Sequence, residues 1–173
     1  MNPLEEVLEW YEVACESHTA VAHALDNHPD SFPENSIFAL QSTKDWKELI
    51  LKTRTEIDDL TVVSLVSIFE QIVIDHLQAV VDSTINQIKD SFAHQVLENR
   101  YRLYPPERWR FVDILDLFKT EIDPRLVGEV KESYKYRSWV AHGRRQLKPP
   151  TVHPYTAYDC LTDFLNTTGL MQR

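Results

Sequence analysis

Two residues near the end of the chain could carry out acid–base and phosphate chemistry. Arg137 and His142 lie in the segment YRSWVAHGRR, residues 136–145. A histidine can accept or donate a proton near neutral pH, and a guanidinium is a permanent cation that can stabilise a phosphate-centred transition state. On an ideal helix, a step of five residues turns two side chains by about 140°. Spacing alone therefore leaves two interpretations, a reaction centre or the basic end of a helix.

The residues around this pair are basic or aromatic: Lys131, Tyr134, Lys135, Tyr136, Trp139, Arg144, Arg145 and Lys148. Cations that contact phosphates, next to rings that stack on bases, are typical of proteins that bind single-stranded nucleic acid. Trp139 can instead be a core residue, because its neighbours Val140 and Ala141 are apolar. The segment predicts a surface for single-stranded nucleic acid and leaves the place of this ring open.

The charge of the chain is distributed unevenly. Residues 100–148 hold twelve of the 18 Lys and Arg but seven of the 27 Asp and Glu, a local balance of +5 within a net charge of −9. The residues outside this segment therefore carry a formal charge of −14. Such asymmetry indicates a surface that faces a polyanion. A solvated helical face would give the same count, and this second interpretation stays open.

Other arrangements that could support catalysis or metal binding are weak. His18, His23 and His28 are spaced by five residues and cannot share one helical face, so they do not form a metal site. His76 falls on an apolar stripe and is expected to be structural, and the two cysteines are far apart in sequence. With three glycines in the chain, a glycine-rich phosphate loop is excluded. We expect neither a metal nor another cofactor.

Composition predicts an all-α protein. Hairpin turns use glycine, and the three glycines here are far fewer than usual, while the prolines lie between periodic segments. The length of 173 residues fits one domain, residues 1–173. The first residues are acidic rather than basic and apolar, and no apolar stretch is long enough to span a bilayer. We therefore expect a cytoplasmic protein without a membrane partner.

Hydrophobic periodicity predicts a bundle of five to six helices. The expected helices cover residues 3–25, 43–88 (with a break near Asp58–Asp59), 91–101, 106–122, 124–142 and a last one from Pro154. Residues 1–28 would be an N-terminal addition. Gly143 follows the fifth helix at the position where a left-handed cap residue is expected. The central helix carries a broad apolar stripe that includes Val62, Leu65 and Phe69.

With these features together, the chain resembles the HEPN superfamily of all-α proteins. Its signature is an arginine, four to six residues, and a histidine, which here is Arg137, the residues SWVA, and His142. The similarity extends to an apolar helix with a Phe–Glu step, Phe69–Glu70, and covers about residues 45–170. Ser138 stands where the family often has Asn or Asp. Arg144 stands where the subgroup controlled by a nucleotidyltransferase antitoxin has a tyrosine, so that form of control is not expected.

The resemblance implies a metal-independent endoribonuclease that cleaves single-stranded RNA, often a toxin of a toxin–antitoxin or phage-defence system. The RNA 2′-hydroxyl would attack the phosphate and leave a 2′,3′-cyclic phosphate. His142 would act as general base or acid, Arg137 would stabilise the transition state and Glu70 would orient the pair. RNA binding is assigned to Lys135, Tyr136, Ser138, Arg144, Arg145 and Lys148. The implied partners are RNA, a second copy that completes a composite site, and a cognate antitoxin.

Two other functions fit the same residues. The first is a non-catalytic HEPN-like module that binds nucleic acid or a nucleotide-processing partner. The second is a helical interaction protein without a nucleic-acid role, which would follow if the charge asymmetry is only a solvated face. Because both the arginine and the histidine of the motif are present, the enzyme is the first expectation.

Overall fold

The computed structural model describes residues 2–38 and 43–172. These residues form six α-helices, α1 (Glu5–Asn27), α2 (Thr43–Asn86), α3 (Ser91–Leu103), α4 (Phe111–Leu117), α5 (Pro124–Ala141) and α6 (Pro154–Thr167), with no strand among them. Four short 3₁₀ helices cover Pro29–Ser31, Pro106–Arg108, Phe118–Thr120 and Leu170–Gln172. The prediction of an all-α helical bundle is confirmed.

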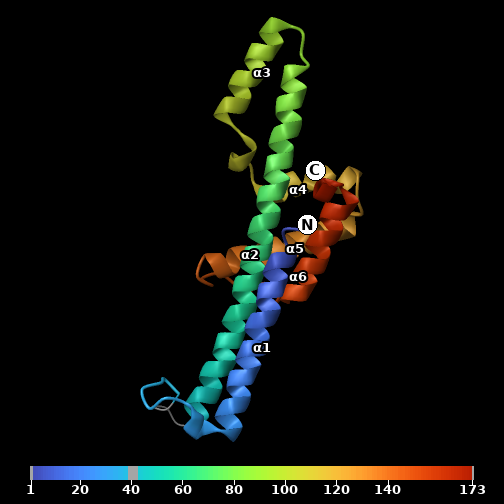
Figure 1. Cartoon of the computed structure of the whole chain (residues 1–173). Coiled ribbons are helices and arrows are strands. Elements are labelled where there is room, and N and C mark those ends of the chain that lie inside the picture. The colour runs from blue at the N-terminus through green and yellow to red at the C-terminus, as the bar shows by residue number, and fades with distance from the viewer. Residues whose placement is uncertain (1, 39–42, 173) are drawn as a thin grey trace.

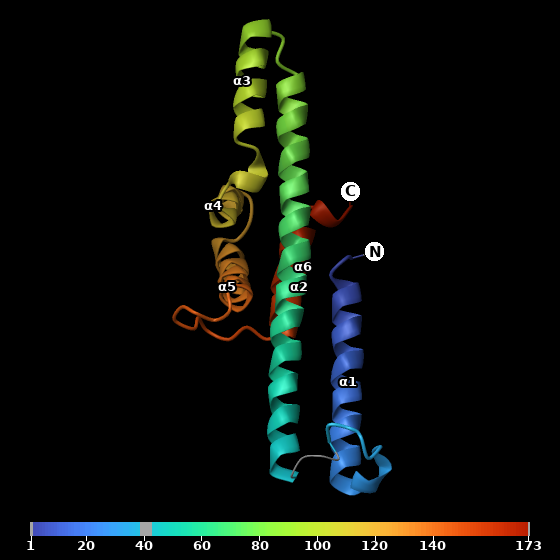
Figure 2. The ribbon, with the colours of Figure 1, turned by 90° about the vertical axis from the view of Figure 1, so that its left-hand side faces the viewer.

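Helix α2 is the axis of the molecule. Its 44 residues span about 66 Å at 1.5 Å per residue. Helix α1 runs antiparallel along the N-terminal half of α2, and α3 folds back along the C-terminal half (Figure 1). Helices α4 and α5 lie on one side of the middle of α2, while α1 lies on the other side (Figure 2). The two ends of α2, which lie beside α1 and α3, thus extend beyond the middle region that packs against α4, α5 and α6.

The core surrounds the middle of α2. Val62, Leu65 and Phe69 are fully buried, which confirms the predicted stripe. The Phe69 ring packs edge-on against the rings of Phe111 and Phe164, with 6.0 Å and 5.2 Å between ring centres. Phe69 therefore joins α2 to α4 and α6. Leu4, just before α1, is 0% exposed and belongs to the same cluster. The first turn of the N-terminal helix is therefore part of the core.

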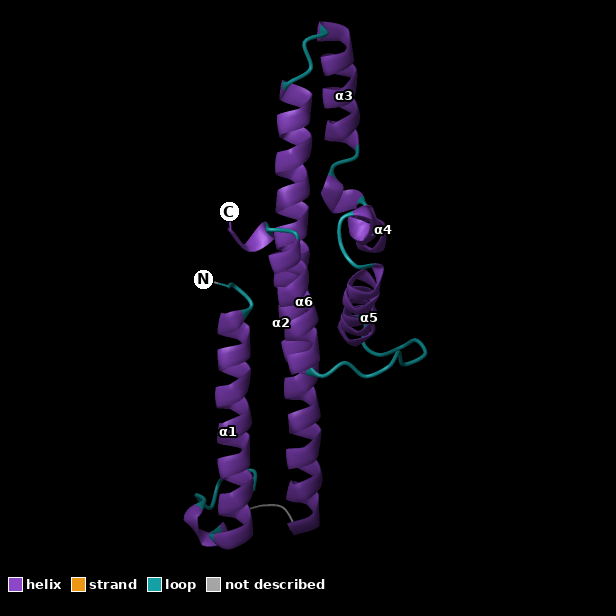
Figure 3. Cartoon of the chain, turned by 90° about the vertical axis from the view of Figure 1, so that its right-hand side faces the viewer, coloured by secondary structure: helices purple, strands orange, loops and turns teal. Residues whose placement is uncertain are grey.

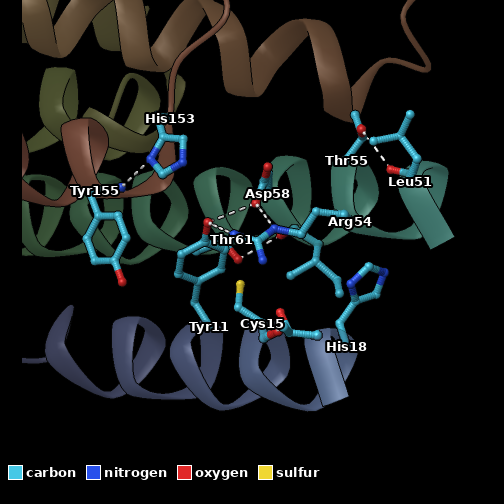
Figure 4. A network of polar contacts seen from close by, with 12 residues as sticks. Tyr11, Cys15, His18, Leu51, Arg54, Thr55, Asp58, Thr61, His153 and Tyr155 are labelled. Atoms are coloured by element: carbon cyan, nitrogen blue, oxygen red, sulfur yellow. Dashed lines mark hydrogen bonds and ion pairs between the residues drawn. The ribbon is translucent and has the colours of Figure 1, made fainter. Parts of the chain in front are cut away.

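The predicted break of α2 near Asp58–Asp59 is wrong, because the helix continues through both residues. Side chains of α1, α2 and α5 compensate the two adjacent carboxylates. Asp58 accepts hydrogen bonds from the Tyr11 hydroxyl at 2.9 Å and from Arg54 Nε at 3.2 Å (Figure 4). Asp59 accepts one from the Tyr136 hydroxyl at 2.5 Å. These contacts hold α1 and α5 against a continuous α2.

The predicted helix over residues 106–122 is also wrong in part. The chain forms a 3₁₀ turn at Pro106–Arg108 and becomes extended at Trp109 and Arg110 before α4 begins at Phe111. The indole Nε1 of Trp109 donates to the carbonyl of Tyr104 at 3.0 Å, which fixes this bend. No described helix is long and apolar enough to cross a membrane.

The two thiols are predicted to react very differently. Burial raises the pKa of the Cys160 thiol to about 11, and its Sγ donates to the Ala157 carbonyl at 3.3 Å. Cys15 on α1 is only half-buried. At neutral pH, we expect one thiol per chain to react with Ellman's reagent in the native protein and both after unfolding. In the folded variant Cys160→Ser, the number of thiols that react with the reagent should stay at one. Rapid reaction of both thiols in the native protein would contradict the burial of Cys160.

Candidate functional site

The C-terminal end of α5 positions the residues of the predicted motif. The helix begins at Pro124 after the Asp123 cap, whose side chain accepts a hydrogen bond from Arg125 N at 2.8 Å. It ends at Ala141 with His142 as its C-cap, and Gly143 follows with φ +73°, as predicted. The amide of Gly143 donates to the Val140 carbonyl, and the next amide donates to the Trp139 carbonyl. This is a Schellman ending, and it turns the chain away from the helix axis.

A loop of residues 143–153 leaves this ending and extends from the bundle before α6 begins (Figure 3). It is tied back by Trp139, whose indole Nε1 donates to the Gln146 carbonyl at 3.0 Å. Between the helix and this loop lies a pocket of about 340 Å³. The helix contributes Tyr134, Lys135, Ser138, Trp139 and His142, and the loop contributes Arg145, Gln146, Leu147 and Pro149.

This pocket, called here the His142 pocket, combines groups that suit a phosphorylated ligand. The imidazole of His142 is exposed, and the Ser138 hydroxyl lies one turn before it on the same face of α5. Lys135 and Arg145 supply positive charge, although Lys135 Nζ also contacts Glu132 at 2.6 Å. Tyr134 and Trp139 provide aromatic surface. The volume of the His142 pocket lies at the lower end of the usual range for small-ligand sites.

Arg137 lies on a different face of α5 and does not line the His142 pocket. Its guanidinium points to α2, where Nη2 contacts the Glu70 carboxylate at 3.1 Å and the Ser67 hydroxyl at 3.3 Å. Arg137 Nε is buried without a hydrogen-bond partner among the described residues. The structure therefore brings Arg137 and Glu70 together, and it separates both from His142 within one chain.

The Glu70 carboxyl lies in a poorly solvated position. Burial raises its pKa, and the nearby Arg137 guanidinium, which acts in the opposite direction, does not cancel this effect. Both side chains keep about a fifth to a quarter of their surface exposed, 21% and 24%. An ion pair of this kind fixes the direction of the guanidinium more than it stabilises the fold.

Asp59 anchors the loop next to the pocket, and no sequence pattern other than the adjacent aspartates points to this role. Its carboxylate is 3% exposed and contacts Arg144 Nη2 at 2.5 Å. The same guanidinium contacts both carboxylate oxygens of Glu56 at 2.8 Å. Arg144 has φ +59°, an uncommon conformation for a residue with a side chain. These ion pairs hold it in that conformation.

Two predicted RNA-binding residues are corrected by these contacts. Tyr136 is 2% exposed, and burial together with the Asp59 hydrogen bond raises the pKa of its phenol, so its ring is a core element and cannot stack on a base. Arg144 is occupied by two carboxylates and acts as a loop anchor. Lys148 remains exposed, with its ammonium 5.6 Å from the centre of the Trp139 ring.

A second pocket of about 340 Å³ lies on the other side of Trp139 and includes Lys52, Asp58, Lys148 and His153. Its mixture of acidic and basic groups makes it less suited to a polyanion than the His142 pocket. Trp139 itself is half-buried and lines both pockets. Trp139 packs against the core cluster, so its core interpretation is met in part, while its role in a binding surface stays a prediction.

Possible metal ligands are scattered in the structure. Within residues 2–38 and 43–172, no group of three His, Cys, Asp or Glu side chains is arranged to hold a metal ion. His18 Nε2 forms a hydrogen bond with the Ile50 carbonyl at 2.7 Å, and the imidazole of His153 stacks on the Tyr155 ring. Comparisons with protein-family models, curated proteins and solved structures find no match for this chain, so its function is inferred from the site.

Proposed function

We propose that this protein is a metal-independent endoribonuclease of the HEPN type that cleaves single-stranded RNA. The His142 pocket is the observation that carries the proposal. It places an accessible imidazole beside hydroxyl, cationic and aromatic groups, in a space that fits one nucleotide unit. An unpaired base can enter such a pocket, whereas a base within a duplex cannot.

The chemistry needs one base and one acid. The base removes the proton from the RNA 2′-hydroxyl, whose oxygen attacks the adjacent phosphorus. The bond from phosphorus to the 5′-oxygen then breaks, and the acid protonates this leaving oxygen. The products are a 2′,3′-cyclic phosphate and a 5′-hydroxyl. His142 supplies one of these proton transfers, and His142 of a second copy supplies the other in a composite site.

Arg137 stabilises the charge on the phosphate in this proposal. Its ion pair with Glu70 fixes the guanidinium on the surface between α2 and α5. Its Nε is buried and has no hydrogen-bond partner among the described residues, so the part of the guanidinium that remains exposed is the part that would face the phosphate. Because Arg137 does not face the His142 of its own chain, the two residues act together only when two copies meet.

A role as a toxin or phage-defence protein under the control of an antitoxin belongs to the same proposal and rests on the resemblance to the HEPN superfamily. The three glycines and the all-α fold are in keeping with it. The cation-rich segment 100–148 includes the whole of α5 and the start of the loop. It supplies positive charge near the pocket in an otherwise acidic chain.

The direct test is an RNA cleavage assay in EDTA. We expect the purified chain to cut a single-stranded RNA and to leave a 2′,3′-cyclic phosphate, detected by mass spectrometry of the products. The same strand with a 2′-O-methyl group at the cleavage position should stay intact, because its nucleophile is blocked. Absence of cleavage over a range of RNA sequences, or cleavage of the methylated strand, would contradict the mechanism.

Substitution of Arg137 separates its chemical role from its structural role. Removing one positioned donor to a transition state commonly lowers turnover by about 10²–10³-fold, and we expect a loss of this size for Arg137→Ala. The variant Ser67→Ala removes one contact of the same guanidinium and should retain most of the cleavage. If Arg137→Ala lowers the melting temperature but the folded protein cleaves at the normal rate, the residue is only an interhelical contact.

A non-catalytic binding module is the second candidate, and the direction of Arg137 favours it. A guanidinium paired with Glu70 at 3.1 Å can be explained by helix packing alone. This function predicts RNA binding through Lys135, Ser138, Arg145 and Lys148 without any cleavage. Retained affinity together with intact RNA in the EDTA assay is the result that would favour the module over the enzyme.

A further inference from the structure

The end of the molecule farthest from α1 lacks a core of its own. The hairpin, defined here as residues 74–104, joins the C-terminal part of α2 to α3, and none of its residues is buried. It nevertheless carries large apolar side chains, and Phe92, Val96 and Leu103 are 75%, 49% and 60% exposed. A helix as short as the 13 residues of α3 is marginal without packing. This exposed apolar surface therefore indicates an interaction site.

A groove of about 530 Å³ runs along the hairpin. Apolar side chains of α2, including Val80 and Ile85, form one wall, and Leu97, Tyr104 and Trp109 form the other. Arg100 brings a positive charge into this lining, with its guanidinium 4.4 Å from the centre of the Tyr104 ring. No carboxylate of the described chain forms an ion pair with it. A fitting occupant must therefore be apolar and must carry negative charge.

The acidic residues of the hairpin do not line the groove, but Asp82 and the neighbouring Glu107 lie near it, because burial together with these two carboxylates raises the pKa of the groove residue Tyr101. Asp82 and Glu98 line a separate, smaller pocket together with His94, and Glu98 contacts His94 at 3.9 Å. Glu107 accepts a hydrogen bond from Gln78. Arg100 is the charged residue that lines the groove itself. Arg102 is exposed on the same helix but lies about 200° around its axis, on the side away from the groove.

Helix α1 presents the complementary surface. Trp10 and Val13 lie one turn apart on the outside of α1 and are 53% and 64% exposed. The exposed residues Glu6, Glu9 and Glu16 flank them. The helix contains six acidic residues and no lysine or arginine. It thus combines apolar anchors with the charge opposite to that of the groove.

The groove of the same chain is out of reach for this helix. Helix α1 lies along the N-terminal half of α2, on the other side from α3, which lies along the C-terminal half (Figure 2). Tyr11 further fixes α1 through its hydrogen bond to Asp58. A second copy of the chain can supply the same helix without this restriction.

We propose that α1 of a second copy docks into the groove of the hairpin, with Trp10 as the apolar anchor and with Glu9 and Glu16, which lie on one flank of α1, directed toward Arg100. This is a helix-in-groove contact, in which apolar residues of one face supply affinity and flanking charges set the orientation. The contact uses neither α5 nor the loop 143–153. It goes beyond the proposed function, since it leaves the His142 pocket open and does not depend on RNA cleavage.

Sedimentation velocity of the full chain over a concentration series tests this contact. We expect reversible association that weakens at high salt, because the charges are exposed. Trp10→Ala should weaken it about tenfold or more, as for a central aromatic anchor. Leu51→Ala, at a side chain that is 69% exposed on α2 outside the groove, is the matched control and should leave association unchanged.

A charge exchange identifies the partner surface. Arg100→Glu should weaken association, and the triple variant Arg100→Glu, Glu9→Arg, Glu16→Arg should restore much of it. Arg125→Glu, at an exposed residue of α5, controls for the change in net charge. Unchanged association of Trp10→Ala, or loss through Arg100→Glu without recovery in the triple variant, would overturn this contact. A monomer at every concentration would contradict the composite site of the endoribonuclease as well. RNA cleavage is read in parallel, so a failure of this contact is distinguished from a failure of the endoribonuclease.

Discussion

Replacement of His142 by alanine is expected to lower RNA cleavage by about 10²–10⁴-fold, the usual contribution of a positioned acid or base. The imidazole is exposed at the end of α5 and lines a pocket with hydroxyl and cationic groups, so its loss should affect proton transfer rather than folding. The melting temperature should stay close to that of the wild type. Single-turnover cleavage in EDTA and thermal unfolding measure the two effects.

His23→Ala provides the matched control, because His23 is an exposed histidine on α1, outside the His142 pocket. It should cleave at the wild-type rate. Arg145→Ala should mainly weaken RNA binding and reduce its salt dependence, since each lost phosphate contact lowers the number of displaced counterions. Equal cleavage by the wild type and His142→Ala would exclude this histidine from the reaction.

Replacement of Asp59 by alanine is expected to destabilise the fold by about 2–4 kcal/mol. The change leaves the buried Tyr136 hydroxyl without its acceptor and removes one of the two carboxylates that hold Arg144. Loss of hydrogen bonds to a buried charged group commonly costs about 1.5–3 kcal/mol. The share from Arg144 is smaller, because about a third of its side chain is exposed, 35%. Chemical denaturation at neutral pH measures the free energy of unfolding.

Two variants bracket this effect. Tyr136→Phe removes one hydrogen bond and keeps the Arg144 contact, so about 1 kcal/mol is expected. Asp113→Ala removes a carboxylate that is 62% exposed and lies 3.9 Å from Arg110, and it should change stability by less than about 0.5 kcal/mol. A cost for Asp59→Ala as small as that for Asp113→Ala would contradict the anchoring role. Because Arg144 holds the loop that forms one wall of the pocket, Asp59→Ala should also weaken RNA binding.

The fold class could be predicted because its causes are local. The apolar positions of α2 recur with the period of a helix. This pattern predicts that Val62, Leu65 and Phe69 share one buried face, and all three are buried. The end of α5 was equally local, because a glycine accepts the left-handed conformation that Gly143 adopts. The starts of α5 and α6 are also local features, because a proline fits the first position of a helix, where its missing N–H is not needed.

The errors arose where distant residues decide the outcome. Two adjacent aspartates in a long helix favour a break, but Tyr11 of α1 and Tyr136 of α5, together with Arg54 one turn away on α2, satisfy both carboxylates. Tyr136 and Arg144 looked like members of a basic, aromatic surface. Burial of the tyrosine and pairing of the arginine with Glu56 and Asp59 depend on residues about 80 positions away, which no local pattern contains.

The sequence by itself determined that this protein is helical, that its cations gather toward the end of the chain, and that an arginine and a histidine stand five residues apart on one helix. These properties follow from composition and from the 3.6-residue turn. Only the tertiary structure decided that Arg137 faces Glu70 while His142 faces a pocket with Ser138 and Arg145. Side-chain direction depends on which face of α5 packs against α2, and that packing is a property of the whole bundle.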